Sequence, residues 1–294
     1  MCTNGWSFRD ERGRPTPLLI VLAAIGGILL VVVAVNRWGT PSDEHAYWLA
    51  SQRLLDGEPL YDPTATSVTP YAYWYPPFVA QVLAPIAAIL PAMAFTAAWT
   101  VVMLFCLWWL AGRDVLVALA LVAFPPVAVE FWYRNIHLVL AVLIVLAIRG
   151  IPALYSVGAL IKFSPGLGIP FLLTGARWRD AAIAAVTGAL LLAISVALSP
   201  DAWRQFLDIL ASRGPTDVSG LLPVPYIARA VTGLVLALVA GRLEPRVGEP
   251  LLIIAIVVAL PTLWMAALST LIALVPIVRS NAIAQRARSE PAAL

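Results

Sequence analysis

The chain has 294 residues, of which 61% are hydrophobic and only 12% are charged, and its mean hydropathy is +0.89. Exposing so much apolar surface to water costs about 25 cal/mol per Å², so this composition excludes a water-soluble domain and indicates a membrane protein. The net charge of +3 does not indicate a nucleic-acid partner, because basic residues in a membrane protein report orientation first. Cys2 and Cys106 lie far apart in the sequence and indicate neither a disulfide nor a metal site.

The first apolar run covers about residues 17–35 and follows a short basic tail. At 1.5 Å per residue it is long enough for a complete membrane span. It ends at Asn36, Arg37 and Trp38 without the small-residue pattern of a cleavage site. We therefore expect a retained membrane helix rather than a cleaved signal peptide.

Short polar or Pro/Gly breaks separate the later apolar runs. These runs lie near residues 76–90, 92–111, 115–130, 136–148, 151–163, 166–174, 181–198, 222–240, 248–260 and 262–278. Lipid requires each true span to be helical. If every run crossed the membrane, the later arginines would alternate onto the outer side, against the positive-inside rule. The run opened by Pro76 and Pro77 and interrupted by Pro85 is therefore predicted to be a re-entrant or surface helix. The predicted fold is an all-α bundle of about ten spans.

This arrangement divides the chain into a cytoplasmic tail (1–16), a transmembrane domain (17–278) and a second cytoplasmic tail (279–294). Most arginines then face the cytoplasm, namely Arg9, Arg12, Arg14, Arg113, Arg149, Arg177, Arg179, Arg242, Arg246, Arg279, Arg286 and Arg288. Two long polar segments, a first outer loop at 37–91 and a second outer segment at 199–221, face outward. The sequence therefore predicts a multi-pass plasma-membrane protein with both termini inside and its chemistry outside.

An acidic pair, Asp43 and Glu44, begins the helical pattern of the first outer loop, which Gly57 ends. Ser42 is in the position of an N-cap, and carboxylates in a first helical turn are stabilised by the helix dipole. That is one reading of the pair. The other is catalytic: Asp43 deprotonates an acceptor hydroxyl as general base, and Glu44 acts as a helper or a metal contact. Both readings can hold together.

The same loop is rich in aromatic residues, which include Trp38, Tyr47, Trp48, Tyr61, Tyr71, Tyr73, Trp74, Tyr75 and Phe78. Tyr and Trp commonly anchor a protein at the membrane interface. Aromatic faces also stack on sugar rings. Tyr47 and Tyr75 are the members of this set that we expect to line a site.

Lys162 is the only lysine of the chain, and it lies near the outer end of an apolar run that Pro165 closes. Its long side chain could reach the interface. However, an ionisable group within the membrane is by default a functional candidate, and the phosphate of a lipid lies at this depth. Lys162 is therefore predicted to bind a lipid phosphate.

A short outer turn at residues 130–137 places an acid, a base, an amide and a histidine close together. Arg134 is expected to bind the same phosphate, or to pair with Glu130. Asn135 and His137 are expected to line the site, although a histidine at a helix start often makes only a local hydrogen bond. The chain contains no zinc-site spacing, P-loop, nucleotide-binding glycine motif or nucleophile elbow.

The second outer segment begins with Ser199 and Pro200, and its apolar residues recur at helical spacing. It predicts an amphipathic interfacial helix that Gly214 and Pro215 end. Such a helix could border the access route of a lipid-linked substrate or simply cap the bundle.

The order of these features resembles the GT-C superfamily of membrane glycosyltransferases, and most closely glycosyltransferase family 87. The resemblance covers roughly residues 15–215. It rests on Asp43 soon after the first span, Tyr47, the run Leu-Leu-Asp-Gly-Glu-Pro-Leu-Tyr-Asp-Pro at 54–63, Tyr75-Pro76-Pro77-Phe78, the 134–137 turn and the Gly158–Pro165 stretch around Lys162. At the turn, the family's Gly-Gln-x-Asn-like stretch is replaced by Arg-Asn-Ile-His.

The resemblance implies an inverting transfer of a sugar, typically mannose, from a polyprenyl phosphate to a cell-envelope glycolipid or glycan. The expected partners are that donor, the acceptor and membrane lipids, and no nucleic acid. No cofactor is expected, and a divalent metal held by Asp43 and Glu44 is not predicted. A transporter, a lipid flippase and a noncatalytic scaffold subunit are the rival readings. A transporter would place ionisable groups throughout the membrane depth and show repeat symmetry.

Overall fold

The computed structural model describes residues 13–65, 69–213, 220–221 and 223–289. The predicted tails, 1–16 and 279–294, and the outer segment 199–221 lie partly outside these ranges. Within them the chain is helical without β-strands, which confirms the all-α class. The elements are α1 (Pro17–Arg37), α2 (Asp43–Leu55), α3 (Pro77–Ala87), α4 (Ala92–Leu110), α5 (Val115–Val122), α6 (Pro125–Tyr133), α7 (His137–Ile148), α8 (Ala153–Ile161), the 3₁₀ helix η1 (Ser164–Leu167), α9 (Gly168–Thr174), α10 (Trp178–Leu198), α11 (Pro200–Arg213), α12 (Tyr226–Ala240), α13 (Pro245–Val258), the 3₁₀ helix η2 (Met265–Ala273) and α14 (Leu274–Ser289).

Three helices in the described ranges are long and apolar enough to cross a membrane: α1, α4 and α10. They contain 21, 19 and 21 residues. At 1.5 Å per residue these lengths match a hydrocarbon core of about 30 Å. Large apolar side chains on these helices, such as Val31 and Leu190, are exposed. Such exposure is favourable where lipid is the solvent, so these helices form the outer surface of the bundle.

The run at 115–130 forms two helices rather than one, because the helix breaks before Pro125 and Pro126. The axes of α5 and α6 differ by 87°. Proline cannot continue a helix whose preceding turn needs its N–H group. If the bent pair crosses as one unit, the described residues contain up to four spans.

The remaining apolar runs form shorter helices. The run at 136–148 becomes α7, whose 12 residues extend about 18 Å, and the run at 166–174 becomes the 7 residues of α9. Neither alone matches the thickness of a hydrocarbon core. The count of about ten spans is therefore not confirmed, and it stays a prediction.

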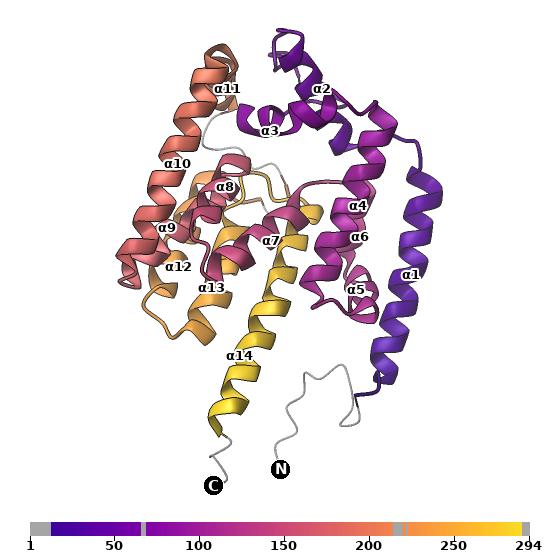
Figure 1. The fold of residues 1–294 in the computed structure, drawn as a ribbon, viewed down its shortest axis with the longest axis vertical. Coiled ribbons are helices and arrows are strands. Elements are labelled where there is room, and N and C mark those ends of the chain that lie inside the picture. Colours follow the sequence, from indigo (N-terminus) through magenta and orange to yellow (C-terminus); the bar gives the residue numbers. More distant parts are fainter. Residues whose placement is uncertain (1–12, 66–68, 214–219, 222, 290–294) are drawn as a thin grey trace.

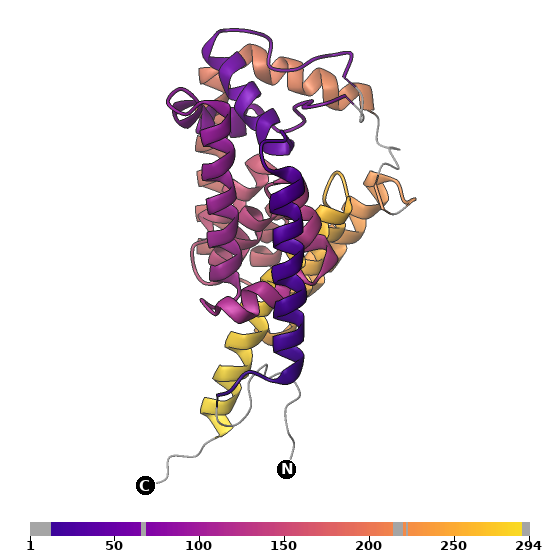
Figure 2. The ribbon, with the colours of Figure 1, turned by 90° about the vertical axis from the view of Figure 1, so that its right-hand side faces the viewer.

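Two polar parts of the chain meet at one end of the bundle. Figure 1 shows α2 and α3 across this end, and Figure 2 shows α11 lying across it as well. The side-chain oxygen of Gln205 on α11 accepts a hydrogen bond of 3.0 Å from the backbone N–H of Leu60. Gln81 on α3 donates a 2.8 Å bond to the carbonyl of Ser195 at the end of α10. α11 forms as predicted, and the Gln205 bond joins it to the first loop, while the Gln81 bond joins α3 to α10.

Arginines hold the turns at the other end of the bundle. Arg279 on α14 donates to the carbonyl of Ala111 after α4. Arg149, after α7, donates to the carbonyl of Pro276, and its guanidinium lies 5.5 Å from the ring centre of Trp109. The turns that follow α4 and α7 therefore meet α14. The acidic and aromatic first loop lies at the end where α1 finishes, away from these arginines.

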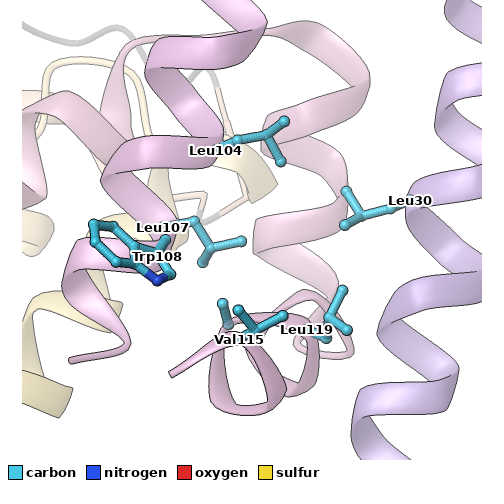
Figure 3. Close-up of a pocket in the computed structure, with 7 residues that line it drawn as sticks. Leu30, Leu104, Leu107, Trp108, Val115 and Leu119 are labelled. Atoms are coloured by element: carbon cyan, nitrogen blue, oxygen red, sulfur yellow. The ribbon is translucent and has the colours of Figure 1, made fainter. Parts of the chain in front are cut away.

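An apolar furrow runs between α1 and α4. In Figure 3, Leu30 of α1 points across it toward Leu104 and Leu107 of α4, and Leu119 of α5 lies below. This part of the furrow holds a cavity of about 170 Å³. A second cavity of about 330 Å³ continues it and reaches Arg134. Because the furrow separates α1 from α4, α1 contacts the bundle mainly through α5.

The contact of α1 with α5 depends on Gly26. A Cβ atom at this position would lie 1.8 Å from the backbone oxygen of Leu119, whereas a Cβ on the neighbouring Gly27 would meet nothing within 4 Å. We therefore expect Gly26→Val to destabilise the protein by on the order of 1–3 kcal/mol, because backbone atoms must move.

Gly27→Val is the matched control, since both substitutions add the same side chain to the same helix. Thermal unfolding of the detergent-purified variants should show a lower midpoint for Gly26→Val alone. Equal midpoints for the two variants would contradict the close packing of α1 on α5.

Candidate active site

Asp43 begins α2, as predicted, and the helix ends before Gly57, whose φ is +71°. Ser42 occupies the N-cap position but makes no side-chain cap hydrogen bond. Its hydroxyl instead accepts a 2.6 Å bond from Arg37 and donates to the carbonyl of Trp132. Arg37 and Ser42 therefore fix the elbow between α1 and α2, and Asp43 follows it directly.

The carboxylate of Asp43 is half-buried and is held by Asn135, whose Nδ2 donates a hydrogen bond to Oδ2. Burial raises the pKa of Asp43 to about 6, although the Asn135 hydrogen bond and the charge of Lys162 act in the opposite direction. A carboxylate with this pKa is mostly ionised at neutral pH, yet it is a stronger base than an ordinary aspartate. Those are the properties of a general base.

The turn between α6 and α7 presents Asn135 to Asp43. Arg134 has the left-handed φ of +49°, which ends α6 and turns the chain toward α7. The side-chain oxygen of Asn135 accepts hydrogen bonds of 2.9 Å from the Tyr75 hydroxyl and 2.8 Å from the backbone N–H of Ile136. These donors fix the orientation of the amide, so its NH₂ group points at Asp43.

Two tyrosines of the first loop support this network. The hydroxyl of Tyr47 donates a 3.0 Å bond to that of Tyr75, and the two rings meet edge to face. Tyr47 is completely buried, whereas Tyr75 is partly exposed. Tyr75 can therefore contact a substrate, and Tyr47 holds it in place.

Lys162 reaches the same site from the end of α8. It is the C-cap residue with an extended backbone, and the chain then enters η1 at Ser164 and Pro165. Its Nζ lies 5.2 Å from the ring centre of Tyr75 and 2.7 Å from Nε2 of His137. The side chain is partly exposed. The ammonium group of this partly exposed side chain therefore lies beside the tyrosine that binds Asn135.

A buried acid lies behind the histidine. Glu130 Oε2 is 2.9 Å from Nδ1 of His137, and Glu130 Oε1 accepts a 2.7 Å bond from the backbone N–H of His137. Both side chains are almost completely buried. Glu130, His137 and Lys162 thus form one chain of contacts that ends at the site.

Arg134 and Glu44 make a second buried pair. The Nη1 atom of Arg134 lies 3.1 Å from Glu44 Oε1, and the same guanidinium donates to the carbonyls of Thr40 and Arg37. Thr96 of α4 also donates to Glu44. Burial raises the pKa of Glu44, against the charge of Arg134. This pair joins the elbow after α1 to the turn after α6.

The structure thus brings four of the sequence-predicted residues to one partly exposed site: Asp43, Asn135, Tyr75 and Lys162. It buries the other four behind them: Glu44, Arg134, Tyr47 and His137. Sequence reasoning considered Glu130 only as a partner of Arg134 and missed its contact with His137. No local signal distinguishes these partners, because both are close to Glu130 in sequence. Metal-binding groups of three or more His, Cys, Asp or Glu do not occur in the described part of the chain.

These features define a class: a helical membrane protein with a carboxylate and an ammonium group facing one site at an end of the bundle. A family model gives the particular family. The model for glycosyltransferase family 87 matches residues 73–288, most of the chain, so the protein belongs to that family of membrane glycosyltransferases. The matched region includes Tyr75, Asn135 and Lys162, and Asp43 precedes it. No curated protein and no solved structure matches the chain.

The buried Arg134–Glu44 pair makes a prediction about stability. In Glu44→Ala, the guanidinium of Arg134 stays buried without its carboxylate, so we expect destabilisation of about 3–5 kcal/mol. Asp201→Ala is the control, because it breaks the exposed Arg204–Asp201 pair and such surface pairs contribute little. Thermal unfolding in detergent measures both. Equal midpoints for the two variants would contradict the structural role of Glu44.

Proposed function

We propose that this protein transfers a hexose, mannose in the first instance, from a polyprenyl phosphate to a hydroxyl of a cell-envelope glycolipid or glycan. The proposal rests on the contacts that bring Asp43 and Lys162 to one site: Asn135 donates to Asp43, Tyr75 donates to Asn135, and Lys162 lies over the ring of Tyr75. One group can accept a proton, and the other can hold an anion. A transfer that releases a phosphate needs both.

In the proposed reaction, Asp43 takes the proton of the acceptor hydroxyl. The acceptor oxygen attacks the anomeric carbon from the face opposite the phosphate, and the bond from that carbon to the phosphate oxygen breaks. The electron pair leaves with the polyprenyl phosphate, whose growing negative charge Lys162 stabilises. This displacement inverts the anomeric carbon, as the family resemblance implies.

Three features favour a lipid-linked donor over a nucleotide sugar. Lys162 lies at the end of an apolar helix, where the phosphate of a membrane lipid is expected. The chain has no glycine-rich nucleotide motif. The surfaces of α1, α4 and α10 are apolar, so a polyprenyl chain can approach the site from lipid. A hydrocarbon tail therefore stays in the membrane while its phosphate reaches Lys162.

The topology follows from the arginines. We propose that the end with α2, α3 and α11 faces outward from the plasma membrane, and that the opposite end, with Arg113, Arg149 and Arg279, faces the cytoplasm. Both termini are then cytoplasmic, and residues 17–278 form one transmembrane domain of about ten spans. In this orientation the sugar is transferred on the outer face.

The most direct test of the proposal is sugar transfer by the purified protein. The protein is reconstituted in liposomes with polyprenyl-phosphate-[¹⁴C]mannose and extracted envelope lipids, and labelled lipid product is measured. The parent protein should form product, and Lys162→Met should reduce kcat/KM by about 10²-fold or more, because the leaving phosphate loses its cation. If the parent moves the donor across the bilayer but forms no product, the protein is a flippase and the proposal is wrong.

Asp43 gives a separate prediction for pH. The base is the ionised carboxylate, so kcat/KM should rise with pH through the pKa of about 6. Below that pKa it should fall about tenfold per pH unit, and it should level off above about pH 7.

Asp43→Asn should lower kcat by about 10²–10⁴-fold and remove this pH limb. Asp56→Asn, an exposed aspartate at the other end of α2, is the control and should keep the parent profile. An unchanged pH limb in Asp43→Asn would show that another group is the base.

A further inference from the structure

Glu130, His137 and Lys162 come from three different helical segments and make a continuous chain of short contacts. Glu130 belongs to α6, His137 starts α7, and Lys162 is the C-cap residue of α8. The two links are 2.9 Å and 2.7 Å long. Glu130 is 0% exposed and His137 is 2% exposed. Neither can touch a substrate, so any role in the reaction must act through Lys162.

The direction of each hydrogen bond in this chain follows from the donors that each group has. An ionised carboxylate can only accept, so the Glu130 contact requires a hydrogen on Nδ1 of His137. A neutral imidazole with that hydrogen has a free lone pair on Nε2. Lys162 has only donors, so its ammonium donates to Nε2. Glu130 thus selects the tautomer of His137 that can accept from Lys162.

This arrangement fixes the head of a long and flexible side chain. One N–H of Lys162 is used by His137, and the Nζ atom lies over Tyr75. Within the described part of the chain, its other N–H groups make no hydrogen bond and can donate to a ligand. The negative charge of Glu130, next to a neutral imidazole, also balances the ammonium group at the apolar end of α8. A phosphate therefore meets a charged donor that is already oriented.

We infer that Glu130 and His137 are positioning residues that orient Lys162 for the phosphate of the donor. The inference rests on the proposed function, because it assigns Lys162 to that phosphate. Losing either residue should weaken phosphate binding and raise the KM for the donor, with a smaller effect on kcat, because Asp43 is untouched. A purely structural role does not predict this selective rise in the donor KM. Such a role would rest on the bond that Glu130 accepts from the backbone N–H of His137, which supports the start of α7.

Two substitutions of His137 separate these roles. Asparagine places its amide near the position of Nδ1, so it can still donate to Glu130 but offers no acceptor to Lys162. Glutamine is longer and can place its oxygen near the position of Nε2, so it can accept from Lys162. Both keep the backbone N–H that Glu130 binds. The pair therefore changes the contact with Lys162 while the start of α7 is preserved.

The test measures binding of polyprenyl phosphate to the purified full-length protein, with unphosphorylated polyprenol as the reference ligand. His137→Asn should weaken phosphate binding and raise the donor KM by about tenfold, the size expected for a charge-assisted hydrogen bond. His137→Gln should stay within about threefold of the parent. Polyprenol binding should not change in either variant. Equal behaviour of the two variants, whether both resemble the parent or both are impaired, would overturn the inference.

Glu130→Gln provides a second measurement that does not depend on the folding of the His137 variants. Its amide can accept from only one of the two His137 donors, so it should also raise the donor KM more than it lowers kcat. A drop in kcat with an unchanged KM would overturn the positioning role.

Lys162→Met separates a failure of the proposed donor site from a failure of the positioning role. If it leaves phosphate binding intact, the proposed donor site itself is wrong; if it abolishes binding while Glu130→Gln and His137→Asn do not, only the positioning role fails.

Discussion

Between α6 and α7 the backbone turns through Arg134 in the left-handed conformation, and the residues around this turn contact α2, α4 and, through His137, Lys162 after α8. Arg134 pairs with Glu44 at the start of α2, and Asn135 holds Asp43 in the same helical turn. Trp99 of α4 donates to the carbonyl of Arg134, and Glu130 fixes His137. The position of Asp43 relative to Lys162 depends on this one turn, because α2 and α8 both reach it through side chains.

Charge is distributed so that the supporting groups are paired and buried, while the proposed reactive residues, Asp43 and Lys162, are partly exposed. Arg134 and Glu44 neutralise each other behind the site, and Glu130 balances Lys162 across His137. Both arrangements avoid an uncompensated buried charge, whose free-energy penalty is large. Asp43 has no cation in such direct contact in the described structure, and burial raises its pKa. The same low-polarity surroundings that raise this pKa would also strengthen the proposed attraction of Lys162 for a phosphate.

The parts of this structure that local chemistry decides could be predicted from sequence. The start of α2 at Asp43, its end before Gly57 and the amphipathic α11 follow from turn residues and helical spacing, and all three are confirmed. Helix lengths were harder to predict, because prolines and glycines divide the apolar runs into pieces such as α9. A hydropathy pattern alone does not say which pieces together cross a membrane.

Long-range partners could not be read from the sequence. The guanidinium of Arg134 bonds to Glu44, 90 residues away, although Glu130 is much closer in sequence. Asp43, Tyr75 and Lys162 were grouped by family resemblance, since no spacing relates them. The role of Glu130 was missed because it depends on a turn whose geometry brings the carboxylate back to the residue seven positions later.

An experimental structure of Asp43→Asn with polyprenyl-phosphate-mannose bound would test directly whether the donor lies between Asp43, which faces the acceptor, and Lys162, which binds the phosphate. The substitution should slow turnover while it keeps the shape of the site. We expect a phosphate oxygen within hydrogen-bond distance of Lys162 Nζ, with the anomeric carbon of the mannose between that phosphate and residue 43. A donor whose phosphate lies away from Lys162, for example among the arginines at the opposite end, would contradict it.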